Sequence, residues 1–491
     1  IALDEPVALS AGQRFSVVER IEGYEGAYLP LEVAAYDAND PDEAQGGYMK
    51  AQRAVANAGE SFYSADGGAT WSDVTTLSAD EVQKRISPSR FGGYPQVNAE
   101  DGVGNVMIKA FTTDGTEPEP EPEPGPDPEE PDDPALRSSF DPREEGLATP
   151  VRDQGATDLC GPFASMASLE TSLVYDGAAS DELVEAGLSP FHAVYFATMG
   201  DEEREAGGLN AFMPDNPYGG GISPFTIANS LAAGKGAVIA REGQTDAAYE
   251  PMDEALRFAS DVRLTGTAAL GLAGGGYWET LEGDALRAAA KRVIAEEGPV
   301  VAEFCSRQGP NFNGENSCYY TAPGQTGYAA DHYVAVVGWD DEFPRENFNK
   351  AMRPESDGAW LVKNSWGTDQ GEAGYFWISY EDATLDVQAA LFGEAKRADE
   401  AVYQYDEAGW TDSLSVGGNA GWAANVFTSG RDEQLDRVQF CTTGVGTAYE
   451  VEVRRGVAAN GSDPRGGELV AACAGVQEFP GWVTVALDEP G

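Results

Sequence analysis

The chain has 491 residues and is 42% hydrophobic, so it is long enough for about three or four domains, each with its own core. Its 83 acidic side chains outnumber its 31 lysine and arginine side chains, which gives a formal charge of −52. Nucleic acids and anionic membranes need cationic partners, so neither is expected to bind, and no apolar run is long enough to predict a transmembrane segment.

The first 116 residues read as an all-β segment. Apolar and polar residues alternate in short runs that Gly, Asn and Asp clusters separate, and this pattern is typical of antiparallel strands. The runs are Phe15 to Ile21, Leu29 to Ala35 and Val103 to Phe111. Residues 117–134 then contain eight prolines and nine acids. Because proline fixes φ and like charges repel, we expect an extended polyproline II spacer there.

A mixed α+β domain is expected over residues 135–398. Helical spacing is seen in Phe163 to Tyr175 and Ala285 to Ala295, and strand-like runs are Pro299 to Phe304, Tyr333 to Trp339 and Ala359 to Lys363. From residue 399 to 491 the chain returns to short strands, such as Asp436 to Thr442 and Ala448 to Arg454. The fold class is therefore α+β in the middle, flanked by all-β sandwich segments.

A candidate nucleophile lies at the start of the first helical run. Cys160 follows a glycine-containing loop, and Pro162 suits the first turn of a helix. A thiol at a helix N-terminus is activated by the dipole and the free N–H groups. The alternative is a buried cysteine that acts only as a small hydrophobe.

The chain holds only two histidines that could serve as the base. His332 stands at the entrance of an apolar strand, whereas His192 begins another helical run and is interpreted as structural. Asn364 ends an apolar strand and can orient the imidazole, and Trp366 can screen that hydrogen bond from water.

These motifs resemble those of the papain-like cysteine peptidases over roughly residues 137–385. The resemblance implies a two-lobed peptidase fold in which Cys160 is the nucleophile, His332 the general base and Asn364 the orienting residue. It also implies that Gln154, six residues before the cysteine, stabilises the oxyanion, and that Gly220 and Gly221 bind an extended substrate. The Cys160 thiolate, paired with the His332 imidazolium, would hydrolyse peptide bonds of protein or peptide substrates without a metal or an organic cofactor.

Three departures from the family pattern accompany this resemblance. Gly161-Pro162 stands where the family usually has Trp-Ala, Thr157 replaces a disulfide cysteine, and Tyr333 replaces a small residue. No inhibitory propeptide is recognised before Ser138. A second hypothesis therefore remains: the chain is a catalytically inert papain-fold adhesin or binding protein, carried on β-sandwich modules.

The other four cysteines fall into two near pairs. Cys305 with Cys318, and Cys441 with Cys473, could each close a loop by a disulfide, or all four could stay free. Cys160 is expected to be unpaired in either case.

Segments 1–116 and 399–491 resemble the lectin-like β-sandwich of some bacterial surface peptidases. The order in that family would place the 399–491 type first, and Ala2 to Pro6 recurs as Ala486 to Pro490, so each segment is interpreted as part of a repeated module. We expect the two segments to pack together into one sandwich, with one copy of the repeat frayed. The resemblance implies an extracellular or cell-surface location and a surface or carbohydrate ligand, although no ligand cluster is visible.

Ser64 to Trp71 fits the Asp-box pattern S-x-D-x-G-x-T-W, which is usually a structural turn. The excess of acid predicts that basic or neutral peptides are preferred over acidic ones near the scissile bond.

Overall fold

The computed structural model of the chain describes residues 6–23, 27–33, 35–36, 54–85, 96–97, 103–114, 137–198, 218, 221–241, 252–271, 281–406, 409–459 and 463–487. The acidic spacer over 117–134 and most of the repeated ends lie outside these residues, so those expectations stay predictions. Across the described part of the chain, no helix has both the length and the apolar character that crossing a membrane requires.

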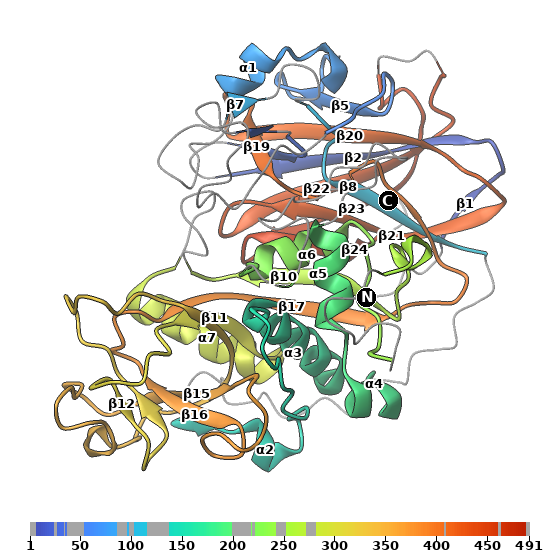
Figure 1. Ribbon diagram of the computed structural model, residues 1–491. Helices are drawn as coiled ribbons and strands as arrows, with labels where there is room; N and C mark the ends of the chain where they lie inside the picture. Colours follow the sequence, from blue (N-terminus) through green and yellow to red (C-terminus); the bar gives the residue numbers. More distant parts are fainter. Residues whose placement is uncertain are drawn as a thin grey trace.

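The two outer segments form a β-sandwich, which is the upper part of the molecule in Figure 1. The first segment supplies β1 (Val7–Leu9), β2 (Arg14–Glu22), β3 (Tyr28–Leu31), β4 (Ala35–Tyr36), β5 (Ser61–Ser64), β6 (Ser72–Asp73), α1 (Ala79–Gln83), β7 (Gln96–Val97) and β8 (Ile108–Thr113). The last segment supplies β18 (Ala401–Tyr403), β19 (Asp412–Ser415), β20 (Ala420–Thr428), β21 (Glu433–Thr442), β22 (Thr447–Arg455), β23 (Glu468–Gln477) and β24 (Gly481–Ala486).

Both sheets of the sandwich mix strands from the two segments. The six-stranded sheet has the order β23-β22-β2-β20-β5-β6, so the N-terminal strand β2 lies between two strands from the C-terminal segment. In the opposite sheet, β8 lies between β21 and β18, and β1 also pairs with β21. The expectation that the two segments pack into one sandwich is therefore confirmed.

The sandwich core explains this mixing. Phe15 and Val17 of β2 pack in the same buried cluster as Phe427, Val438 and Phe440 of the C-terminal segment. Either segment alone would leave an apolar face and unpaired strand edges in water. The strand predicted from Leu29 to Ala35 is shorter than expected: β3 ends at Leu31, and β4 begins at Ala35.

One carboxyl group lies inside this apolar core. Glu19 of β2 is 2% exposed, and its Oε1 has no hydrogen-bond partner among the described residues. Burial raises the pKa of Glu19 well above its ordinary value. The folded state favours the protonated form of Glu19. Its contribution to the free energy of unfolding is therefore complete below the pKa of Glu19 in the unfolded chain, and it is lost as the pH rises through the pKa in the folded chain.

We therefore expect Glu19→Gln to stabilise the protein increasingly as the pH rises. The gain in the free energy of unfolding should be small at pH 5 and about 1–3 kcal/mol at pH 8, because the amide never has to ionise in the core. Urea unfolding at both pH values measures it. Glu22→Gln, at the exposed end of the same strand, is the matched control. An equal change at both pH values would contradict this interpretation.

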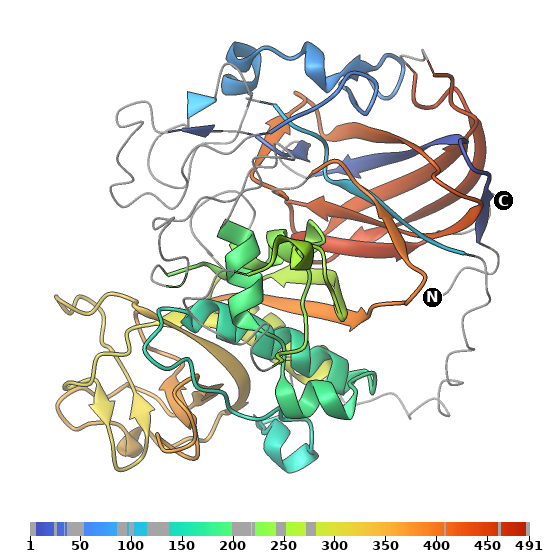
Figure 2. The ribbon, with the colours of Figure 1, turned by 45° about the vertical axis from the view of Figure 1, so that its right-hand side comes forward.

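The middle domain is the lower part of the molecule in Figures 1 and 2. Its helices are α2 (Pro142–Glu145), α3 (Cys160–Tyr175), α4 (Asp181–Ala186), α5 (Pro190–Thr198), α6 (Pro224–Ala232) and α7 (Gly283–Glu296). Its strands are β9 (Ser139–Phe140), β10 (Val262–Ala269), β11 (Val300–Phe304), β12 (Phe312–Asn313), β13 (Cys318–Tyr319), β14 (His332–Asp340), β15 (Ala359–Lys363), β16 (Tyr375–Ser379) and β17 (Asp386–Ala395). The two helical predictions and the three strand predictions are confirmed within three residues at each end.

One continuous sheet joins the two domains. Its order β12-β13-β16-β15-β14-β11-β17-β10-β24-β21-β8-β18 runs from the middle domain into the sandwich, with β10 pairing with β24. Buried polar contacts reinforce this junction: the Trp482 indole N–H donates to Asn229 Oδ1 at 3.0 Å, and Gln439 Nε2 donates to the Leu264 carbonyl at 2.7 Å. The sandwich is therefore packed directly against the middle domain.

The structure contains neither of the two disulfides considered from the sequence. None of the five cysteines is in a disulfide, and Cys160 is therefore not cross-linked, as expected. Cys441 and Cys473 belong to different sheets and to different buried clusters. The Cys318 thiol instead donates to the Asn347 carbonyl at 3.1 Å.

The Asp-box pattern forms the structural turn that the sequence predicts. Asp66 accepts hydrogen bonds from the Thr70 N–H and hydroxyl and from the Ser64 hydroxyl. These bonds lower the pKa of Asp66 to about 2, so the carboxylate holds the turn across the physiological range.

Candidate active site

The candidate nucleophile begins the central helix of the middle domain. Cys160 is the first residue of α3, a helix that is buried along most of its length and that packs against β14 and β17. Backbone N–H groups of Tyr333 and Gly161 act on the Cys160 thiol and lower its pKa against the larger raising effect of burial. Because Tyr333 follows His332, the sulfur lies beside the start of β14, where the candidate base is located.

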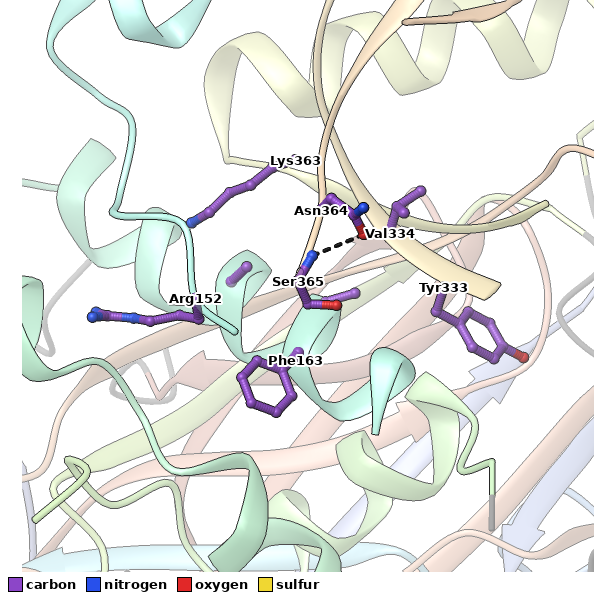
Figure 3. Close-up of a pocket in the computed structure, with 9 residues that line it drawn as sticks. Arg152, Phe163, Tyr333, Val334, Lys363, Asn364 and Ser365 are labelled. Carbon is purple, nitrogen blue, oxygen red and sulfur yellow. Dashed lines mark hydrogen bonds between the residues drawn. The ribbon is translucent and has the colours of Figure 1, made fainter. Parts of the chain in front are cut away.

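The candidate base is held by the candidate orienting residue. His332 is 4% exposed, and its Nε2 lies 2.8 Å from Asn364 Oδ1. The Ser365 backbone N–H also donates to Asn364 Oδ1, at 2.9 Å, and this contact identifies that atom as the amide oxygen. The His332 Nε2–H must therefore donate to it, which leaves Nδ1 as the basic nitrogen. Figure 3 shows the hydrogen bond from the Ser365 N–H to Asn364 as a dashed line, at the end of the strand that carries Lys363.

An aromatic ring covers this pair. Trp366 stacks on His332 with ring centroids 4.5 Å apart and an interplanar angle of 28°. The stack shields the His332–Asn364 hydrogen bond from water, as expected from the sequence. His192 is elsewhere: it is fully buried on α5, and its Nε2 lies 2.9 Å from the Leu256 carbonyl. That contact fits its interpretation as a structural histidine.

Gln154 links the cysteine loop to the asparagine loop. Its backbone N–H donates to the Ser365 carbonyl at 2.8 Å, and its Oε1 accepts from the Ser365 hydroxyl at 2.6 Å. One amide N–H donates to the Thr157 carbonyl at 2.7 Å. Since a glutamine amide carries two N–H donors, the second is available for a substrate oxygen. Thr157 is buried here without the disulfide that the family usually has at this position.

Burial disfavours both charged forms of the candidate catalytic pair. It raises the pKa of the Cys160 thiol, against the lowering effect of the surrounding N–H groups. It lowers the pKa of His332, against the raising effect of the Asn364 hydrogen bond and the Asp331 charge. A thiolate–imidazolium pair would thus depend on mutual attraction and on the hydrogen bonds at both ends.

The glycine after Cys160 has a steric reason. A Cβ on Gly161 would lie 2.2 Å from the Ile222 carbonyl oxygen and 3.2 Å from a ring carbon of Tyr333. The backbone that follows Gly221 therefore runs directly over the start of α3. Gly221 is exposed, whereas Gly220 lies outside the described residues, so the substrate role of both glycines stays a prediction.

We expect Gly161→Ala to destabilise the protein by about 1–3 kcal/mol, because two backbone segments must move apart to admit one methyl group. Larger side chains, including the tryptophan typical of the family, should cost more. Thermal unfolding measures the change. Gly221→Ala is a close control, since a Cβ there meets nothing within 4 Å. Equal melting temperatures for the two variants would show that the contact is not a constraint.

Sequence interpretation missed a group of buried charges behind the site. The Lys363 ammonium donates to the Thr149 hydroxyl at 2.6 Å, and burial lowers the pKa of Lys363 to about 8 although Glu170 opposes the shift. Arg152 lies 4.0 Å from Glu170. Figure 3 shows Arg152, Lys363, Asn364 and Ser365 around one small pocket. The sequence does contain a signal for these buried charges, because Lys363 ends an apolar strand and Glu170 lies within a largely apolar helix.

Comparison with known families identifies both domain types. The papain family cysteine protease model matches residues 278–395, which include His332 and Asn364 but not Cys160. The Lectin like domain model matches residues 1–84 and 402–491, the two segments that share the sandwich. The chain is therefore similar to the papain family of cysteine proteases over residues 278–395 and to the Lectin like domain over its two outer segments.

Individual relatives agree with this assignment. A cathepsin L-like peptidase of Aedes aegypti is 26% identical over 247 residues, covering 50% of this chain and 60% of the relative. Cathepsin L of Sarcophaga peregrina is 29% identical over 242 residues, covering 48% of this chain and 57% of the relative. The chain thus spans less than two thirds of the length of these curated relatives.

Solved structures of similar architecture also exist. The clostridial cysteine protease Cwp84 after propeptide cleavage superposes with a TM-score of 0.54 at 25% identity, covering 71% of this chain and 80% of that one. The cysteine protease and lectin-like domains of Cwp84, a surface layer associated protein of Clostridium difficile, give a TM-score of 0.52 at 24% identity and cover 71% of each chain.

Proposed function

We propose that this chain is a secreted or surface-attached cysteine-type endopeptidase that acts on protein or peptide substrates. In this proposal Cys160 attacks the peptide carbonyl, His332 moves the proton, Asn364 orients His332, and Gln154 stabilises the oxyanion. The observation that carries the proposal is the His332–Asn364 hydrogen bond of 2.8 Å, which sets Nδ1 as the basic nitrogen at the entrance of β14.

The proposed reaction needs only these groups. His332 Nδ1 takes the proton of the Cys160 thiol as the sulfur bonds to the carbonyl carbon. The free N–H of Gln154 and the Cys160 backbone N–H stabilise the oxyanion, each by roughly 3–4 kcal/mol by analogy with other oxyanion holes. The C–N bond then breaks, and His332 gives its proton to the leaving amine. Water, deprotonated by His332, finally releases the acyl group from the sulfur.

The lectin-like domain and the homologous surface protein support the proposed location. Cwp84, which shares both domain types, is described as surface layer associated. An extracellular or cell-surface location also suits the strongly acidic composition, because a net charge of −52 favours solubility. A surface or carbohydrate ligand of the lectin-like domain stays a prediction from the resemblance.

Labelling with an epoxide-type peptidase inhibitor tests the proposal. We expect stoichiometric modification of Cys160, because only an activated thiol beside a base opens the epoxide quickly. Cys473, which is also partly exposed, is an internal control thiol and should react at least about 100-fold more slowly. Mass spectrometry of the digested protein identifies the modified residue. An unmodified Cys160 would support the inert adhesin or binding protein instead.

A further inference from the structure

A carboxylate lies one strand away from the candidate catalytic pair. Glu303 of β11 is directly opposite Tyr333 of β14, and the next pair in the register is Phe304 with His332. The Tyr333 ring in turn lies against Gly161 at the start of α3, 3.2 Å from the position of its missing Cβ. Glu303 is therefore separated from the cysteine loop by one tyrosine side chain.

The surroundings of Glu303 are acidic. It is half-buried, it accepts a hydrogen bond from the Tyr333 side chain, and it is directly opposite Asp386 of β17 in the strand register. Burial raises the pKa of Glu303, the charges of Asp386 and Asp331 raise it further, and the Tyr333 hydrogen bond opposes this shift. The charge of Glu303 also acts on Cys160.

The neighbouring acids are engaged in local contacts. Asp331 Oδ1 accepts from the Ser306 N–H at 2.7 Å, and Asp386 Oδ2 accepts from the Gln388 amide at 3.0 Å. A carboxylate has about four acceptor positions, and the Tyr333 hydroxyl can fill only one of those on Glu303. A cationic side chain of a substrate that lay beside Glu303 would meet a carboxylate that can accept its hydrogen bonds. The neighbouring charges, which are also negative, would attract it as well.

We propose that Glu303 is a specificity-determining residue that selects substrates with an arginine or lysine side chain close to the scissile bond. This inference rests on the proposed peptidase function and gives it a substrate class. The bound cation would pair with Glu303 and offset its field at Cys160, where the negative charge disfavours the thiolate. The basic side chain therefore improves the attack as well as the binding.

Matched peptides test this inference. In each pair, arginine or its neutral isostere citrulline occupies one position, scanned from four residues before to four residues after the scissile bond. We expect the parent chain to prefer arginine at one position by about 10–100-fold in kcat/KM, the range of a partly buried charged hydrogen bond. Glu303→Gln should bring that ratio close to one, and Glu303→Lys should reverse it.

Two controls separate this inference from the function on which it rests. Glu342→Gln makes the same change of charge at an exposed position beyond the far end of β14, and it should keep the parent's ratio. Cleavage by the parent with a ratio near one at every position, or an unchanged ratio in Glu303→Gln, would overturn the inference but leave the peptidase function standing. A parent chain that cleaves none of the peptides would overturn both. A parent ratio near one overturns the inference without any variant, whereas an arginine preference is assigned to Glu303 only by its loss in Glu303→Gln. Cleavage of the citrulline peptides by Glu303→Gln at the parent's rate shows that this variant is folded.

Discussion

Cys160→Ala should lower kcat/KM for peptide hydrolysis by about 10⁴–10⁶-fold, and His332→Ala should have an effect of similar size. The proposed reaction needs both side chains. Without the Cys160 sulfur no acyl intermediate forms, and without His332 Nδ1 the thiol has no base. The double variant should therefore be no slower than the slower single variant. Steady-state kinetics on a fluorogenic peptide measures all three.

Asn364→Ala should be less damaging, at about 10–100-fold, because it removes the partner that orients the imidazole and not the imidazole itself. The His332 pKa gives a second readout. The Asn364 hydrogen bond raises the pKa of His332 against the lowering effect of burial, so its loss should move the titration to lower pH. NMR can follow this titration because the chain has only two histidines.

The matched control for this series is Glu342→Gln, which is far from the site and should keep full activity. A Cys160→Ala variant that retained more than about one per cent of the parent's kcat/KM would contradict the assignment of the nucleophile. A His332 titration that did not change in Asn364→Ala would contradict the role given to Asn364.

The sequence predicts the elements that carry the candidate site residues better than it predicts the contacts that support them. Cys160, His332 and Asn364 each stand at the end of a regular run, and the structure brings those run ends together. The approach of Ile222 to Gly161 could not be predicted, because two segments separated by 60 residues meet there and neither contains a signal for the other. Buried charges such as Lys363 and Glu170 also depend on partners from distant parts of the chain.

In the sandwich, too, the sequence predicts the strands but not which of them are neighbours. Alternation of apolar and polar residues correctly predicts β2, β21 and β22, although only β22 alternates in burial, while β2 and β21 are buried along most of their length. Alternation does not tell which strands are neighbours. That β2 lies between β20 and β22 depends on the shared core and on a few buried polar contacts between the two segments.

One of those contacts predicts how strongly the two segments are held together. Asn425 of β20 is fully buried, and its amide N–H groups donate to the Val106 carbonyl at 3.1 Å and to the Ile108 carbonyl at 2.9 Å. Its Oδ1 accepts from the Ser61 hydroxyl at 2.5 Å. A single side chain of the C-terminal segment thus satisfies three polar groups of the N-terminal segment.

We expect Asn425→Leu to weaken the association of the two segments by about 3–4 kcal/mol, which corresponds to roughly a 100–1,000-fold rise in the dissociation constant. Leucine is similar in size but removes the side-chain donor to the Ile108 carbonyl and one of the two donors to the Val106 carbonyl, which keeps the Ile108 N–H. The measurement uses a chain with a protease site introduced between residues 117 and 134. After cleavage, the parent's two fragments should still elute together in size-exclusion chromatography and separate only in denaturant, whereas the Asn425→Leu fragments should separate on dilution. Asn419→Leu, an exposed asparagine just before β20, should behave like the parent. If the parent's fragments separate on cleavage alone, the two segments do not depend on each other as the shared sheets imply.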